Sequence, residues 1–378
     1  MSIRSDRIAS HFLELVRIDS LSRREGAIAG RLERELRALG AEVEYDTAAE
    51  RVGGEVGNLV AHLAGTVDVD PILLCAHMDT VEPGIGVTPI VDGDIVRSDG
   101  RTVLGGDDKS GIAIVMECAR VCHESPVPHP PLEIVFTVCE EVGLLGSRNL
   151  DVELLRAERG FVFDSDAAGF VFTKAPGSNR IDAVVHGRAA HAGMAPEDGV
   201  SAIVVVAEAI AAMRLGRIDD QTTANLGRIE GGRAINIVPD EVRLEGEARS
   251  HDPAKLDAQC AHMRRCLEEA SARHPGARVE VIVESLYDAM SVDDDAPIMQ
   301  LLRRAAAELG RSITAAGMGG GCDANVLNQR GLEVVNLGTG MHDIHTTKEW
   351  LRISDMIATA EVTLAAIRVA AAPTRPGS

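Results

Sequence analysis

The feature of this sequence that most constrains its fold is a series of short apolar runs that alternate with helical patterns up to about residue 175. We expect strands at Asn58–Leu63, Ile72–Ala76, Leu132–Val138 and Phe161–Phe163, with a helix at Ser110–Cys122 between the second and the third. Strands of this length that alternate with helices indicate an α/β domain with a mixed, largely parallel sheet flanked by helices.

The composition fits a core that is packed by aliphatic side chains. Apolar residues make up 45% of the 378 residues, but the aromatic residues are only six Phe, two Tyr and one Trp. The interior must therefore be filled mainly by Ala, Val, Leu and Ile, which suits buried parallel strands. A chain of this length exceeds the usual size of one hydrophobic core, so we expect two domains or one domain with a large insertion.

Two helices are expected near the N-terminus. Ser5 is placed to cap a helix that extends to Arg17, and Glu25–Leu39 should form the second helix. The second helix should end at Gly40, because glycine readily adopts the left-handed conformation found at helix C-termini.

The pattern changes near Ser178 and returns to the α/β type after Met290. We therefore predict one domain made of residues 1–177 and 291–378, interrupted by an inserted α+β domain of residues 178–290. The elements expected within the insertion are strands at Ile181–Val185, Thr223–Ile229, Ala234–Val238, Val242–Arg249 and Arg278–Val283, and helices at Ser201–Leu215 and Pro253–Arg273.

The charge and the termini exclude several classes of partner. A formal net charge of −20 argues against binding to nucleic acid or to anionic membranes. The first residues lack a continuous apolar core, so we expect neither a signal peptide nor a membrane span, and we expect a cytoplasmic location. The seven cysteines form no paired CxxC spacing, which favours reduced thiols over a disulfide framework.

Clusters of acidic residues and histidine occur where the predicted strands end. His77 and Asp79 directly follow the apolar run at 72–76, and residues two positions apart in an extended chain lie on the same side. An imidazole whose second nitrogen is held by a carboxylate is a favoured metal ligand. Because α/β proteins place ligands at the carboxyl ends of their strands, this edge of the sheet is the expected site.

Adjacent carboxylates occur twice in the same region. Asp107 and Asp108 stand at the start of a predicted helix, where either could be an ordinary N-terminal cap. Glu140 and Glu141 follow the strand that ends at 138, and two buried carboxylates repel each other unless a cation or a proton intervenes. One of this pair could bind a metal while the other exchanges a proton with the attacking water.

Two more segments complete the set of candidate ligands. Asp164 and Asp166 follow the strand at 161–163, and His345 lies in the C-terminal segment 340–349. Mixed Asp, Glu and His ligands without thiolates suit a pair of zinc, cobalt or manganese ions.

The order of the segments HMDT, GGDDKSG, CEEVG, FDSD and HTTKE resembles the M20 metallopeptidases, and most closely their peptidase T-like branch, over nearly the whole chain. The resemblance implies two divalent metal ions per chain, Zn2+ in the first place and Co2+ or Mn2+ as alternatives. It implies His77 and Asp164 as ligands of one ion, Glu141 and His345 as ligands of the other, Asp107 as the bridge, Glu140 as the general base and Asp79 as the group that orients His77. Asp107 is preferred to Asp108 because it stands two residues before the lysine, and Asp164 to Asp166 because it directly follows the strand.

The same resemblance implies that the insertion is a lid and dimerisation domain, so that a homodimer is expected. It assigns His191, Asn236 and Arg249 to contacts with the scissile carbonyl or with the substrate carboxylate. Simpler interpretations also fit these residues. His191 could be a surface histidine, Asn236 could shape a turn before Pro239, and Arg249 could be a surface charge.

The sequence thus predicts a hydrolase that cleaves amide bonds of short peptides, in the manner of an aminopeptidase or tripeptidase. A water that bridges the metals would be the nucleophile, with Glu140 accepting its proton. An aminoacylase or deacetylase acting on N-acyl amino acids would use the same metals and is the first alternative. A metal-binding regulatory protein without catalysis is the second, and the presence of both Glu140 and Glu141 argues against it because metal binding alone needs no base.

Overall fold

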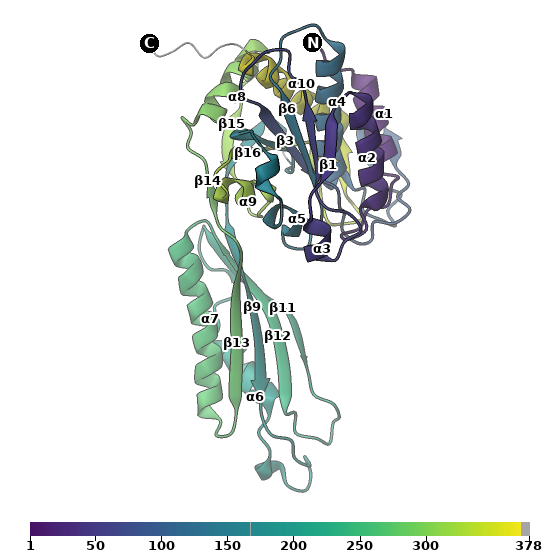
Figure 1. Cartoon of the computed structure of the whole chain (residues 1–378). Helices are drawn as coiled ribbons and strands as arrows, with labels where there is room; N and C mark the ends of the chain where they lie inside the picture. The colour runs from purple at the N-terminus through teal and green to yellow at the C-terminus, as the bar shows by residue number, and fades with distance from the viewer. Residues whose placement is uncertain (167, 372–378) are drawn as a thin grey trace. The chain divides into compact units, whose positions relative to one another are not determined.

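The computed structural model describes residues 1–166 and 168–371 (Figure 1). The chain separates into two compact units according to its internal contacts. The first unit contains residues 1–174, 291–318 and the described residues from 322 onward, and the second contains residues 175–290 and 319–321.

The first unit is built on a nine-stranded mixed sheet with the strand order β1-β2-β6-β3-β7-β16-β8-β14, in which β15 pairs with β8. Strands β6, β3, β7 and β16 run parallel to their neighbours within this group, whereas β1 and β2 add to one side in antiparallel fashion. The strands are β1 (Glu42–Tyr45), β2 (Leu59–Leu63), β3 (Ile72–His77), β6 (Leu132–Thr137), β7 (Arg159–Val162), β8 (Phe170–Ala175), β14 (Met290–Ser291), β15 (Thr314–Gly317) and β16 (Glu333–Leu337).

Helices cover this sheet, and every residue of the central strands β3 and β6 is buried. Helix α4 packs on β3 and contacts α1 and α10, while α2 contacts β1 and β2, and α9 contacts β7 and β16. The helices of the unit are α1 (Ser5–Leu15), α2 (Gly26–Ala38), α3 (Ala48–Val52), α4 (Gly106–Glu124), α5 (Leu145–Arg148), α8 (Pro297–Glu308), α9 (Asp323–Gln329) and α10 (Ile353–Ala370). The predicted mixed, largely parallel sheet flanked by helices is confirmed.

A small antiparallel sheet joins two distant segments of the first unit. Its order is β17-β18-β5-β4, and its strands are β4 (Ile90–Asp92), β5 (Ile95–Arg97), β17 (Met341–His342) and β18 (Trp350–Arg352). Trp350 pairs with His342 on one side and with Arg97 on the other. The loop between β17 and β18, which carries His345, is therefore anchored at both of its ends.

The second unit is an antiparallel sheet with the order β10-β11-β12-β9-β13, packed against two helices. Its strands are β9 (Gly177–His186), β10 (Gly216–Arg217), β11 (Thr222–Gly231), β12 (Glu241–Ser250) and β13 (Arg278–Tyr287), and its helices are α6 (Ala202–Ala212) and α7 (Pro253–Arg273). Ile181, Val185 and Leu244 of the sheet form one core with Val205 of α6 and Met263 of α7. The period-two pattern of these strands thus buries one face under the helices.

Two local predictions are wrong. Ser5 does not cap α1, because the N-cap residue is Arg4, whose backbone N donates to Glu117 Oε1 at 2.9 Å and so fixes the helix start one residue earlier. The predicted strand Ala234–Val238 is absent, since the chain reverses between β11 and β12 there and makes only an isolated bridge between Ile237 and His191. The apolar side chain of Ile235 is fully exposed instead of facing a core.

The predictions for Gly40 and for the cysteines are confirmed. Gly40 follows α2 with a φ of 79°, in the left-handed region that favours glycine. All seven cysteines are buried and unpaired. Among the helices of the described residues, none combines the length and the apolar character that crossing a membrane requires.

Candidate metal centre

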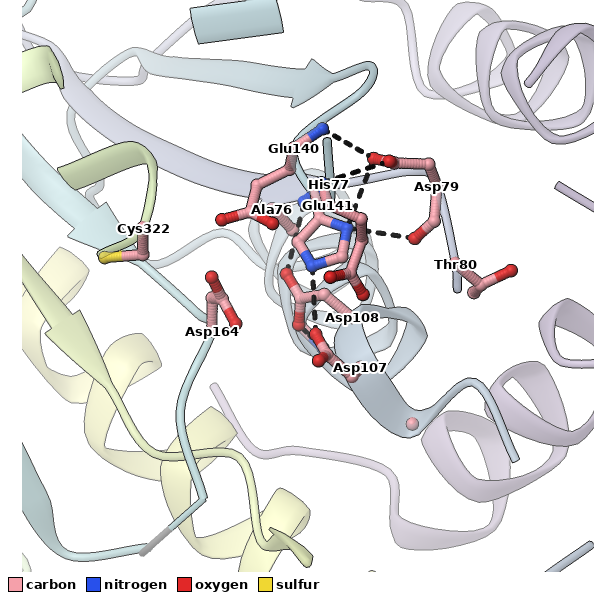
Figure 2. Close-up of polar contacts among 12 residues, drawn as sticks. Ala76, His77, Asp79, Thr80, Asp107, Asp108, Glu140, Glu141, Asp164 and Cys322 are labelled. Carbon is pink, nitrogen blue, oxygen red and sulfur yellow. Dashed lines mark hydrogen bonds and ion pairs between the residues drawn. The ribbon is translucent and has the colours of Figure 1, made fainter. Parts of the chain in front are cut away.

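The carboxyl ends of three neighbouring parallel strands carry the candidate ligands. His77 is the last residue of β3 and pairs with Thr137 at the end of β6, so that Glu140 and Glu141 emerge beside it. Asp164 follows β7, which pairs with β3 on the other side. Figure 2 shows these side chains gathered around His77. The parallel pairing therefore brings together His77 and Asp164, which are 87 positions apart in the sequence (164 − 77).

Asp107 lies between two histidines. Its Oδ1 is 2.9 Å from Nε2 of His77, and its Oδ2 is 3.1 Å from Nε2 of His345. The same nitrogen of His345 is 2.9 Å from Oε2 of Glu141. One carboxylate that presents a separate oxygen to each of two imidazoles has the arrangement expected of a ligand shared between two cations.

Asp108 has a different set of contacts, although it is adjacent to Asp107. Its Oδ2 accepts from the backbone N of His77 at 3.2 Å, and its Oδ1 accepts from the backbone N of Gly111 at 3.1 Å. The second contact is that of an N-terminal cap, because the backbone at 107 and 108 is not helical and the regular turns of α4 begin after it. The side chain of Asp107 thus contacts two imidazoles, whereas the side chain of Asp108 accepts hydrogen bonds from backbone N–H groups.

Asp79 connects His77 to the Glu140–Glu141 pair. Its Oδ1 accepts from the backbone N of Glu140 at 2.9 Å and lies 3.5 Å from Nδ1 of His77, which also contacts the backbone oxygen of Asp79 at 3.0 Å. Its Oδ2 accepts from the backbone N of Glu141 at 3.2 Å and from the hydroxyl of Ser22 at 2.6 Å. Asp79 therefore contacts the ring of His77 mainly through its backbone oxygen, and its buried carboxylate binds the backbone at the start of the Glu140 segment.

Asp164 is held by a side chain that the sequence did not single out. The amide of Asn336 on β16 accepts from the backbone N of Asp164 at 2.8 Å and donates to its backbone oxygen at 2.6 Å. Asp166, the alternative ligand, is exposed and stands outside both groups of candidate ligand atoms.

Among the residues that the structure describes, two groups of ligand atoms are close enough to hold cations. They are His77 with Asp107 and Glu141, and His77 with Glu140 and Asp164, and within each group the atoms lie within 4.8 Å of one another. The electrostatics fit this use. Burial first, and the neighbouring carboxylates second, raise the pKa of Glu140, Glu141 and Asp164. A divalent cation would relieve the repulsion that otherwise keeps protons on these groups.

The pKa values of the two histidines are also raised, by their contacts with these carboxylates. Burial alone would lower the pKa of His77, but its contacts with Asp107 and Asp79 raise it well above its usual value. The contacts with Asp107 and Glu141 raise the pKa of His345 to about 10. Among the described residues, the buried Oε1 of Glu141 has no hydrogen-bond partner. The donor set of carboxylates and imidazoles, with one buried oxygen unused, suits divalent metal ions.

Sequence reasoning missed two buried carboxylates that support the centre. Glu349 accepts hydrogen bonds from the segment that carries Asp107, and Glu25 accepts from the backbone N of Cys139 at 3.0 Å, directly before Glu140. Glu349 stood within the C-terminal motif and could have been suspected from that position. Glu25 had no such signal, because it precedes α2 and reaches Cys139 only through the tertiary fold.

The residues predicted in the insertion lie in the second unit. His191 and Asn236 are exposed, and their segments pair through the backbone N of Ala192, which donates to the oxygen of Asn236 at 3.0 Å. Nδ1 of His191 accepts from the backbone N of Gly193 at 3.2 Å and of Met194 at 3.1 Å. Arg249, on β12, donates to both oxygens of Glu247 at 3.1 and 2.9 Å.

Comparisons with known proteins agree with the fold. Residues 173–275 match the family described as peptidase dimerisation domain (M20_dimer), and residues 58–178 match peptidase family M28. The chain is 42% identical to the uncharacterized protein YqjE of Bacillus subtilis over 98% of this chain and 100% of that protein.

Two solved structures are similar over the same length. One is aminopeptidase PepT from Bacillus cereus, at 41% identity and a TM-score of 0.88, and the other is a tripeptidase from Staphylococcus aureus, at 40% identity and a TM-score of 0.92. Each match covers 98% of this chain and 100% of the other. The fold, the candidate ligands and these relatives together define a metallopeptidase. The chain belongs to the M20 family of metallopeptidases, in its peptidase T-like branch.

Proposed function

We propose that this metallopeptidase cleaves short peptides with two divalent metal ions, as an aminopeptidase or tripeptidase. The observation that carries the proposal is the position of Asp107, whose two oxygens face His77 and His345 separately. The names of the two similar structures, an aminopeptidase and a tripeptidase at about the same identity, support peptides as the substrate class.

The chain's own residues divide into ligands and a base. His77 and Asp164 would hold one ion, Glu141 and His345 the other, and Asp107 would serve both. Zn2+ is the ion we favour, with Co2+ and Mn2+ as alternatives. When bound, the two ions would acidify a water molecule and polarise the scissile carbonyl. Glu140, whose pKa is raised by burial, would take the proton from this water and return it to the leaving amine.

His191 is suited to stabilise the negative charge that develops on the carbonyl oxygen. Because two backbone N–H groups donate to its Nδ1, the neutral ring must carry its proton on Nε2. An exposed Nε2–H of fixed orientation is a hydrogen-bond donor for an oxyanion. We propose Asn236 and Arg249 as substrate contacts, with the substrate carboxylate competing with Glu247 for the Arg249 guanidinium.

We further propose that residues 178–290 act as a lid and form a homodimer. The strand β10 pairs only with Thr223 and Ala224, so among the described residues the rest of the outer edge of β11 has no neighbouring strand. Ile203, Val204 and Ile235 are exposed in the same unit. A free strand edge and exposed aliphatic side chains favour association with a second copy. Light scattering on the purified chain tests this, and a monomer at micromolar concentration would contradict it.

Two measurements test the proposed activity. Elemental analysis of dialysed protein should find two ions per chain, and a tight content of one ion that a second ion does not improve would contradict the two-metal centre. A panel of tripeptides, dipeptides and N-acetyl amino acids should then show turnover of the peptides. Preference for the N-acyl amino acids would instead indicate the aminoacylase alternative, and no turnover of any compound would favour a regulatory role.

A further inference from the structure

Glu349 is a buried carboxylate that binds the backbone of the segment carrying Asp107. It is 1% exposed, and its Oε2 accepts from the backbone N of Leu104 at 2.7 Å and of Gly105 at 2.9 Å. Its Oε1 accepts from the backbone N of Asp107 itself at 3.1 Å. Three N–H groups that precede the first regular turn of α4 are therefore satisfied by one side chain that lies more than 240 residues away in the sequence.

Two glycines precede Asp107, one required by its backbone conformation and the other by the contact with Glu349. Gly105 has a φ of 74°, which disfavours any residue with a Cβ. A Cβ on Gly106 would lie 3.0 Å from Oε1 of Glu349, which is closer than almost all contacts of real side chains. Gly106 thus leaves the space that the carboxylate of Glu349 needs to reach the backbone.

Glu349 is itself fixed in position and stands close in sequence to His345. Its backbone N donates to the oxygen of Thr346 at 3.1 Å, and Trp350, the next residue, begins β18. Two residues of the segment 345–349 contact Asp107. His345 contacts the side chain at Oδ2, and Glu349 contacts the backbone N.

We propose that Glu349 is a positioning residue of the metal centre, which holds the Leu104–Asp107 backbone so that the carboxylate of Asp107 faces both His77 and His345. The inference rests on the proposed two-metal centre. Groups that orient a ligand without touching the ion commonly account for about 10- to 100-fold in metal affinity. Glu349 holds a ligand's backbone and is expected to act on the same scale.

A purely structural role would give a different result, and the chain offers a matched control. Glu133 on β6 is also 1% exposed, and its carboxylate accepts from the backbone N of Arg156 and of Ala157 at 2.8 to 3.0 Å. It has the same chemistry as Glu349 within the same unit, but it contacts none of the candidate ligands. Loss of either carboxylate should lower the melting temperature. Only the loss of Glu349 should weaken metal binding.

The experiment compares Glu349→Gln, Glu133→Gln and the unaltered chain, each stripped of metal and titrated with Co2+ well below its melting temperature. Visible absorption of bound Co2+ reports affinity, number of sites and coordination. Fluorescence of Trp350, the only tryptophan of the chain, reports changes beside Glu349. The amide introduced by Glu349→Gln would turn an NH2 group toward a backbone donor, so we expect affinity to fall about 10- to 100-fold with an altered Co2+ spectrum. Glu133→Gln should bind Co2+ as the unaltered chain does.

A second variant tests the inference should Glu349→Gln not fold. Gly106→Ala retains Glu349 but displaces its carboxylate, and we expect the same direction of change in Co2+ affinity. If Glu349→Gln folds and its Co2+ affinity is unchanged, the positioning role is overturned and the proposed centre is left intact. If Glu349→Gln does not fold, unchanged Co2+ affinity in Gly106→Ala has the same meaning. Failure of the unaltered chain to bind Co2+ would instead overturn the centre itself, and the inference with it.

Discussion

Glu140→Gln tests most directly whether Glu140 acts as the general base and not as a metal ligand. The side chain is buried, and the amide is nearly isosteric with the carboxylate, so the surrounding packing should persist. The backbone at 140 is held by Asp79 and does not depend on the Glu140 side chain. We therefore expect a folded protein with unchanged metal content that lacks only the proton acceptor.

The expected loss of turnover follows from that single missing function. General base catalysis contributes about 10²- to 10⁴-fold, which corresponds to about 3 to 5 kcal/mol of barrier. Steady-state hydrolysis of a tripeptide should therefore show kcat reduced by this factor with a small change in KM. Elemental analysis of the same preparation checks the metal content, and a thermal melt checks the fold.

Glu141→Gln is the matched comparison, because Glu141 is adjacent in sequence and contacts His345 at 2.9 Å. We expect this variant to lose metal, since an amide is a much weaker ligand than a carboxylate. Glu140 also belongs to one of the two groups of candidate ligand atoms found among the described residues, so the comparison tests directly which of the two glutamates binds metal. If Glu140→Gln lost metal while Glu141→Gln kept it, the roles of base and ligand would have to be exchanged.

Three further predictions follow from individual contacts. His191→Ala should lower kcat about a hundredfold or more with little change in KM or metal content, and unchanged kcat would remove His191 from the mechanism. His345→Ala should reduce the metal content from two ions to one and leave the fold largely intact, as circular dichroism would show, because this side chain is half exposed. Burial is the largest single effect and raises the pKa of Glu35, but the contacts with His11, Arg31 and Arg120 together outweigh it and set the pKa at about 2, below the ordinary 4.5. This gap corresponds to at most roughly 3 kcal/mol of stability at neutral pH, and to less once solvent screening of these ion pairs is counted. That stability is present above the unfolded pKa and is lost as the pH falls through about 2. Glu35→Gln should therefore lower the urea midpoint at pH 7 and leave it nearly unchanged at pH 2, and equal effects at both pH values would contradict the argument.

Much of the fold followed from the sequence, because it depends on local periodicity. The runs at 72–76 and 134–136 are apolar at consecutive positions, which requires burial on both faces and hence a covered parallel sheet. The left-handed turn at Gly40 follows from the lack of a side chain. The prediction at 234–238 failed because an apolar run was taken for a strand although no neighbouring strand was available to pair with it.

The candidate site shows the same division. The sequence alone determined which residues could be ligands, because acidic residues and histidine at the ends of parallel strands must meet at one edge of the sheet. Only the tertiary structure distinguishes the contacts of Asp107 from those of Asp108, since adjacent residues of identical chemistry differ solely in what surrounds them. It alone also shows the contacts of Glu25, Asn336 and Glu349 with the candidate site, because each contact is made to the backbone of a segment distant in sequence. Contacts of this kind leave no periodicity in the sequence, and they exist only once the chain has folded.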